Sequence, residues 1–289
     1  NDYEQAFPTI VKAIHQSNGG HGQAINAGLR RVTGQYVKVV DSDDWLDAIA
    51  YHKMLSFLNT RLKATNELDM VISNFTYEKV GAKHKKSMRY PFLPEAAMFT
   101  WQTVHFPRGK YLLMHSVIYR TSLLIDEAKL VLPKHTFYVD ELYVFEPLPY
   151  VNKMVYLNLD LYHYFIGRSD QSVNEQVMIR RIDQQLWVNK ALINYFSACQ
   201  DQNEQRHDYM EKYVEIITTI SSVLLMKDGS LTMLMLKADL WQFIEKTNPK
   251  LYHELRRGAF GIGVHLPGTL GRKTVVGAYN IAQKMYGFN

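Results

Sequence analysis

A short apolar segment that ends abruptly in carboxylates constrains the fold of this chain more than any other feature. Residues 36–40, Tyr-Val-Lys-Val-Val, have the composition of a strand buried on both faces of an α/β sheet. Asp41, Asp43 and Asp44 follow within four positions, where mutually repelling carboxylates disfavour a strand. A helix cap needs one such group, and Asp47 suits that role, so the cluster favours a divalent cation bound together with substrate phosphates. Because ligands bind beyond the carboxyl ends of strands in open α/β sheets, we predict a metal–phosphate site here.

Composition predicts an ordinary globular protein. The 289 residues are 47% hydrophobic and 21% charged, which suits one large domain or two smaller ones. Cys199 is the single cysteine, so an internal disulfide framework is excluded and a reducing compartment, most simply the cytosol, is expected. No apolar run approaches the roughly 18–20 residues that a spanning helix needs, and no signal peptide is visible.

The formal net charge of +5 is unevenly distributed. Residues 77–90 and 251–289 each carry a net charge of +4, so the remainder of the chain is slightly acidic. Such basic patches favour anionic partners, either membrane headgroups or nucleic acid, although solvated surface charge explains each patch equally well. No nucleic-acid recognition motif accompanies the charge, so we expect no nucleic-acid partner.

A glycine-rich turn precedes the apolar segment. Residues 18–22 read Asn-Gly-Gly-His-Gly, and residues 23–32 have a helical pattern that ends before Gly34. A helix that opens after such a turn can hold a diphosphate at its N-terminus. A plain strand–turn–helix connection is the alternative.

The order and spacing of these segments resemble family 2 of the inverting glycosyltransferases. Members of that family read Asn-x-Gly, then Ala-Arg-Asn-x-Gly, then Gly-x-Tyr, then a strand that ends in Asp-x-Asp-Asp, and residues 18–46 follow this series. The resemblance implies an α/β fold of the GT-A type, with a mixed, mainly parallel sheet flanked by helices and followed by a helical C-terminal region. It also implies a nucleotide-sugar donor.

The resemblance divides the chain into two parts. Residues 1–173 are expected to form a GT-A-like catalytic domain, and residues 174–289 a helical domain with a basic tail. Family members carry an upstream strand and an Asp-Asp-Gly-Ser turn that hold the nucleotide base and ribose, and this sequence contains neither. We therefore expect the catalytic domain to be N-terminally incomplete. The helical pattern predicts helices over Glu175–Cys199, Asp208–Met226, Leu231–Thr247, Pro249–Arg257 and Val275–Tyr286.

The resemblance also implies roles for individual residues. Asp43 would bind Mn²⁺ or Mg²⁺ with help from Asp41 or Asp44, and Asp140 would be the catalytic base. The acceptor region would include His115 and Glu141, although His115 could instead face the metal. The donor and its diphosphate would contact Asn18, Gly19, Gly20, Asn26, Asp41, Arg168 and Ser172. Each role has a plainer alternative, since an Asp at a helix start is a common cap, an Arg in a loop is commonly solvated, and a lone His in a strand is commonly a core residue.

Two departures from the family pattern leave a second function open. Ile25 stands where relatives carry Arg, and Val139 stands where they carry Glu. The main hypothesis is inverting, metal-assisted transfer of a hexose from a UDP-sugar to a glycan or lipid-linked acceptor. The alternative is a non-catalytic carbohydrate- or partner-binding module on a degenerate GT-A fold.

The basic tail suggests where such an enzyme would work. Relatives often extend lipid-linked or wall-attached glycans at the cytosolic face of the membrane. Residues 258–289 combine cations with an amphipathic stretch, which is typical of peripheral contact with an anionic membrane surface. The alternative is that the tail completes the helical domain, with Tyr279 and Ile281 packed inward.

Overall fold

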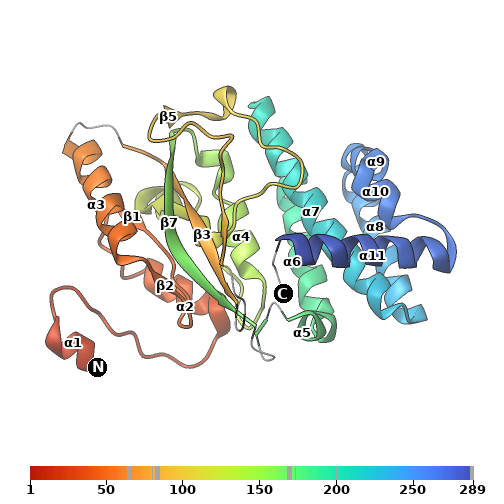
Figure 1. Ribbon diagram of the computed structural model, residues 1–289, viewed down its shortest axis with the longest axis horizontal. Coiled ribbons are helices and arrows are strands. Elements are labelled where there is room, and N and C mark those ends of the chain that lie inside the picture. Colours follow the sequence, from red (N-terminus) through yellow and green to blue (C-terminus); the bar gives the residue numbers. More distant parts are fainter. Residues whose placement is uncertain are drawn as a thin grey trace.

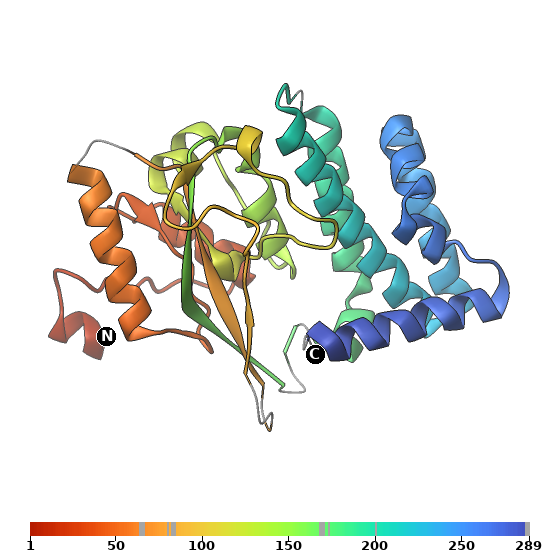
Figure 2. The same ribbon diagram turned by 45° about the horizontal axis from the view of Figure 1, so that its top comes forward.

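The computed structural model shows a sheet-containing part followed by a helical part (Figure 1, Figure 2). It describes residues 1–63, 67–79, 81, 85–167, 171–172, 174–199 and 201–286. In the described residues, no helix combines the length and the apolar character needed to cross a membrane.

The central sheet is mixed, as predicted. Its strand order is β1 (Tyr36–Val37), β6 (Val117–Arg120), β3 (Met70–Lys79), β7 (Met154–Ile166) and β2 (Trp45–Leu46), while β4 (Lys86–Met88) pairs with β3 and β5 (Met98–Phe99) pairs with β7. The long β3–β7 ladder is parallel, but β1–β6, β6–β3, β3–β4, β7–β2 and β7–β5 are all antiparallel. The expectation of a mainly parallel sheet is therefore wrong. Strand direction depends on the connections between strands, which the apolar runs do not encode.

The segment that leads to the carboxylates pairs only briefly. Tyr36 and Val37 form β1 opposite Arg120 and Tyr119, and residues 38–44 then leave the sheet. The apolar pattern of residues 10–14 predicts a short strand leading into the glycine turn, but this described stretch forms none. The patterns of residues 68–77 and 85–92 predict two strands of a hairpin, and the antiparallel β3–β4 pairing confirms it. The tip at residues 80 and 82–84 lies outside the described residues.

Helices cover both faces of the sheet (Figure 1). On one face, α3 (Ala48–Lys63) buries Met54 and Leu58 against Val71 of β3 and Ile118 of β6. On the other face, α4 (Val139–Phe145) belongs to the large core that continues into the helical part. The N-terminal helices are α1 (Asp2–Ala6) and α2 (Gly20–Leu29), and short helical turns span Trp101–Thr103, Met114–Ser116, Leu123–Glu127 and Leu148–Tyr150.

The helical C-terminal region is confirmed. It contains α5 (Glu175–Arg180), α6 (Ile182–Ala198), α7 (Glu204–Asp228), α8 (Leu231–Thr247), α9 (Pro249–Arg257), α10 (Ala259–Val264) and α11 (Gly268–Tyr286). Tyr209 of α7 packs against Phe106, with ring centroids 4.4 Å apart, and a single hydrophobic core runs through both parts. The helix α11 runs from the far end of this region back towards the sheet (Figure 2).

Candidate active site

Residues 38–44, which follow β1 and are called the carboxylate segment below, are fixed in place by Lys38. Its Nζ donates hydrogen bonds to the carbonyl oxygens of Met114, His115 and Val117, at 2.9, 2.7 and 3.2 Å. Burial lowers the pKa of Lys38 to about 7, although the charges of Asp41 and Asp44 oppose that shift. Lys38 therefore joins the carboxylate segment to the start of β6 and brings His115 beside it.

The carboxylate of Asp44 is held by β7. Tyr162 Oη donates to Asp44 Oδ2 at 2.5 Å, and the backbone N–H of Phe165 donates to Asp44 Oδ1 at 2.8 Å. Burial raises the pKa of Asp44 to about 6, these two hydrogen bonds lower it, and the charges of Asp41 and Asp43 raise it again. Asp44 is thus ionised at neutral pH and titrates in the mildly acidic range.

Asp41, Asp44 and His115 form a cluster of possible metal ligands, since their ligand atoms all lie within 4.8 Å of one another. His115 Nε2 lies 3.8 Å from Asp41 Oδ2 and 3.9 Å from Asp44 Oδ2. The His115 ring stacks on Tyr164 at 4.1 Å, and burial lowers its pKa to about 3, so the imidazole is neutral. Two carboxylates and a neutral imidazole fit a divalent cation, and the nitrogen ligand suits Mn²⁺ better than Mg²⁺, which prefers oxygen.

This cluster differs from the predicted set of metal ligands. Asp41 and Asp44 are in it, but His115, expected to face either the metal or the acceptor, takes the place of Asp43. Asp43 Oδ2 instead accepts a hydrogen bond of 3.2 Å from Gln171 Nε2, which also donates to the carbonyl oxygen of Phe165. Asp43 is therefore oriented towards the segment that follows β7.

His21 and Asp140 stand beside Asp41. His21 Nε2 lies 3.1 Å from Asp41 Oδ1. Burial lowers the pKa of His21, but the hydrogen bond and charge of Asp41 and the charge of Asp140 raise it, and the net shift is upward. The pKa of Asp140 is also raised, because burial and the charge of Asp41 outweigh the effect of His21 and of the backbone N–H groups at the start of α4. The three groups form one electrostatic cluster.

Asp140 and Glu141 lie in the first turn of α4 but face different surroundings. The helix begins after Tyr138, which has a left-handed φ of 65° and whose hydroxyl donates to the carbonyl oxygen of Ser172 at 3.2 Å. Glu141 Oε1 accepts a 3.3 Å hydrogen bond from Gln185 of α6, and burial raises the pKa of Glu141 well above its usual value. Glu141 therefore lies at the junction with the helical part.

The glycine turn, residues 18–22, packs against residues 132–135. Gly20 has φ +79°, and a Cβ at Gly22 would lie 2.4 Å from the carbonyl oxygen of Pro133. Asn26 is buried, and its amide bonds both the carbonyl oxygen and the N–H of Leu132, at 2.8 and 2.9 Å. Asn18 Oδ1 accepts from the N–H of Gly20. These contacts fix the start of α2 against residues 132–135, which gives Asn26 a structural role.

Several residues of the candidate site were not predicted from the sequence. His21, Lys38, Tyr162, Tyr164 and Gln171 contact the carboxylates or His115 directly. A His within a glycine turn and a Lys before an Asp cluster are the two signals that the sequence offered. Arg168, a predicted diphosphate contact, lies outside the described residues.

Comparison with solved structures defines the class of fold. The crystal structure of TarS 1-349 from S. aureus superposes with a TM-score of 0.61 at 15% sequence identity, covering 98% of this chain and 78% of that one. The chain has a GT-A fold.

Sequence comparison defines the family. Residues 1–122 match the family model of glycosyl transferase family 2, and this part of the chain belongs to that family. EpsH of Bacillus subtilis (strain 168), named as a glycosyltransferase, is 24% identical over 231 residues, which are 75% of this chain and 60% of EpsH. GgaB of the same organism, named as a minor teichoic acid biosynthesis protein, is 30% identical over 70 residues, 24% of this chain and 7% of GgaB. The chain thus spans less than two thirds of the length of these relatives.

Proposed function

We propose that the protein transfers a hexose from a nucleotide-diphosphate sugar, most simply a UDP-sugar, to a glycan or lipid-linked acceptor with inversion. The observation that carries this proposal is the cluster of Asp41, Asp44 and His115 with Asp140 coupled to it electrostatically. A cation-binding group and a carboxylate of raised pKa side by side are what a metal-assisted displacement requires.

Asp41, Asp44 and His115 would hold Mn²⁺ or Mg²⁺, with Asp43 at the edge of the site. A bound divalent cation neutralises charge that develops on a diphosphate leaving group. Asn18, Gly19 and Gly20 of the glycine turn stay proposed donor contacts, as does Ser172. Arg168 also stays a proposed contact from the sequence, although it lies outside the described residues. Arg is suited to this role because its guanidinium forks onto two phosphate oxygens.

Asp140 is the proposed general base. A base works best when its pKa approaches the working pH, and burial together with the charge of Asp41 shifts Asp140 in that direction. It would accept the proton of the acceptor hydroxyl as that oxygen attacks the anomeric carbon. His21 is placed to orient Asp41 and to balance the charge of both carboxylates.

A donor screen tests the proposal. Full-length protein is incubated with Mn²⁺ and a panel of UDP- and GDP-sugars, and released nucleotide is measured with and without EDTA. We expect metal-dependent release from one donor that disappears in Asp140→Asn. Donor binding without any release, in the presence of candidate glycan acceptors, would favour the non-catalytic binding module. Ile25 and Val139, the two departures from the family pattern, both belong to the large hydrophobic core.

The acceptor and the place of action also belong to the proposal. GgaB is named for teichoic acid biosynthesis, and a glycan or lipid-linked acceptor at the cytosolic face of a membrane is consistent with that similarity. The basic residues of α9 and α11 would provide the peripheral contact.

A further inference from the structure

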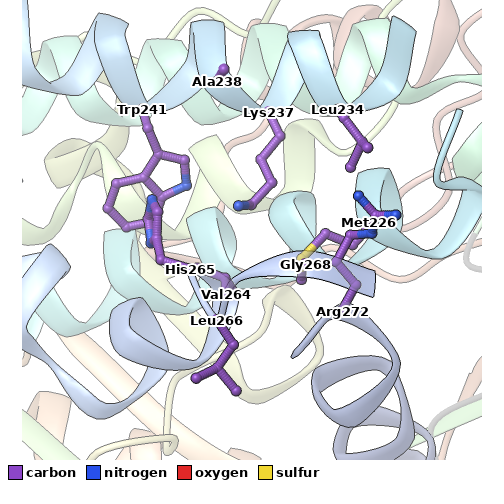
Figure 3. Close-up of a pocket in the computed structure, with 10 residues that line it drawn as sticks. All are labelled: Met226, Leu234, Lys237, Ala238, Trp241, Val264, His265, Leu266, Gly268 and Arg272. Atoms are coloured by element: carbon purple, nitrogen blue, oxygen red, sulfur yellow. The ribbon is translucent and has the colours of Figure 1, made fainter. Parts of the chain in front are cut away.

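A cavity of about 360 Å³ lies in the helical part (Figure 3), whereas the carboxylates follow β1 in the sheet-containing part. The helix α8 forms one wall, and the last turn of α7, the α10–α11 connection and the start of α11 form the others (Figure 3). The lining residues are Met226, Leu234, Lys237, Ala238, Trp241, Val264, His265, Leu266, Gly268 and Arg272.

The charged groups of this cavity are all cationic. Lys237 and Arg272 line it together with His265, and no carboxylate is among the lining residues. Burial lowers the pKa of Lys237, and the positive charges of Arg256 and Arg272 lower it further. Burial also lowers the pKa of His265, and the positive charges of Lys237 and Arg256 lower it further. Like charges gathered in a partly buried space destabilise one another unless an anion joins them.

Lys237 has no hydrogen-bond or ion-pair partner among the described residues. In the part of the chain that the structure describes, no carboxylate contributes to the electrostatics of Lys237, and its ammonium group has no hydrogen bond or ion pair. Figure 3 shows this group pointing from α8 into the cavity. Arg272 is bound only weakly, through a 3.5 Å contact of Nη2 with Thr269 Oγ1. Both cations are therefore available to a ligand.

The other side of the cavity is mainly apolar, and hydrogen bonds fix the Trp241 and His265 side chains in it. Trp241 Nε1 donates to Ser222 Oγ at 3.0 Å, and the His265 ring stands edge-on to the indole at 4.3 Å. His265 Nδ1 bonds the carbonyl oxygen of Gly261 at 2.7 Å, which fixes the ring. Leu234 and Leu266 complete this surface, and Leu266 is 39% exposed at the mouth.

We propose that this cavity binds a phosphate group carried on an apolar chain. The phosphate oxygens would contact Lys237 and Arg272, and the chain would lie on Leu234, Leu266 and Trp241. Phosphate takes up several charge-assisted hydrogen bonds at once, and Arg offers two in a planar fork. The proposed site is separate from the carboxylate site and does not depend on glycosyl transfer.

Calorimetry with octyl phosphate, inorganic phosphate and octanol tests the chemistry of the site. We expect octyl phosphate to bind at least tenfold more tightly than inorganic phosphate, and octanol not to bind. Lys237→Met and Arg272→Met should each weaken octyl phosphate about tenfold. The matched control is Lys246→Met, which removes an exposed cation from the same helix. Competition by phosphatidic acid vesicles would identify a lipid headgroup as the source, whereas competition by soluble phosphomonoesters alone would identify a free metabolite.

Thermal unfolding gives an independent readout. Lys237→Met should melt higher than the wild type without ligand, because it removes an unpaired and partly buried charge, and octyl phosphate should no longer raise its melting temperature. Asp140→Asn should bind octyl phosphate like the wild type, so failure of the proposed transferase activity would leave this test intact. Equal binding of octyl phosphate by the wild type, Lys237→Met and Arg272→Met would overturn the proposal, as would equal binding of octanol.

Discussion

The hydroxyl group of Tyr162 donates a 2.5 Å hydrogen bond to the carboxylate of Asp44 and accepts a 3.1 Å hydrogen bond from the backbone N–H of Asp41. One side chain of the long strand β7 thus fixes both Asp41 and Asp44. The segment itself leaves the sheet after Val37, so it depends on such contacts for its shape. Lys38 makes the corresponding connection to β6.

Removing the Tyr162 hydroxyl should therefore impair the metal site before it impairs the fold. Tyr162→Phe keeps the buried ring but deprives Asp44 and Asp41 of a partner. We expect a loss of about 1–2 kcal/mol in the free energy of unfolding and a larger relative loss of Mn²⁺ affinity. Urea unfolding and calorimetry measure the two. Tyr164→Phe is the control, and unchanged Mn²⁺ binding in Tyr162→Phe would show that the hydroxyl does not shape the site.

Metal binding should weaken as the pH falls through about 6. Burial raises the pKa of Asp44 to about 6, and a protonated carboxyl is a poor ligand. The effect on the free energy of unfolding has the opposite sign. Because the pKa of Asp44 in the folded state exceeds the unfolded value of 3.8, protonated Asp44 stabilises the fold. This stabilisation is fully present below pH 3.8 and is lost as the pH rises through about 6. Metal-free Asp44→Asn should lack this loss. Urea unfolding from pH 4 to pH 7, with Mn²⁺ titrations at the same values, measures both effects.

Single substitutions distinguish the cluster seen in the structure from the set of ligands predicted from sequence. If Asp41, Asp44 and His115 hold the cation, His115→Phe should lower Mn²⁺-dependent UDP affinity tenfold or more. The sequence pattern alone predicts that Asp43→Ala abolishes the Mn²⁺-dependent binding of UDP. Calorimetry on both folded variants decides between these outcomes. A loss in Asp43→Ala together with full affinity in His115→Phe would remove His115 from the ligand set.

Asp140→Asn should keep donor binding and lose transfer by roughly 10²–10⁴-fold, as expected for a general base. Glu141→Gln is the matched control, because it lies next in the same helical turn but bonds Gln185 of α6. Rates with the donor found in the screen, at saturating Mn²⁺, provide the measurement. Transfer by Asp140→Asn at nearly the wild-type rate would shift the role of base to Glu141.

Local signals predicted some elements well and tertiary relationships poorly. The helices α8 and α9 begin where predicted, because Ser230 and Asn248 cap them through side-chain bonds to Met233 and Leu251. Strand direction, by contrast, follows from connections between distant segments, and the sheet is less parallel than expected.

The site shows the same division. Asp41 and Asp44 were predicted from a cluster of adjacent residues. His115 joins them through the pairing of β1 with β6 and the hydrogen bond from Lys38 to its carbonyl oxygen. His21 likewise reaches Asp41 through the packing of α2. Such pairings depend on tertiary structure, which spacing along the chain does not reveal.

The proposed contact with a membrane surface would use the exposed side of α11. Leu270 and Ile281 of α11 lie about three helical turns apart, so they share one side of the helix, and they are 80% and 62% exposed. Tyr279 is instead half-buried against the core, where Lys227 lies over its ring. The alternative, in which the tail completes the helical domain, places Tyr279 and Ile281 inward; the structure agrees with it for Tyr279 but not for Ile281.

Substitution on this face tests the contact without disturbing the core. The protein should float with anionic liposomes at low salt, and Leu270→Ser/Ile281→Ser should weaken flotation strongly, because two exposed apolar side chains leave the interface while every cation remains. Ile49→Ser/Val131→Ser is the matched control, since those side chains are 68% and 77% exposed on the sheet-containing part. High salt should release the wild type, because attraction between exposed charges and lipid headgroups is screened. Equal flotation of the two double variants, or none by the wild type, would show that α11 serves only to complete the helical part.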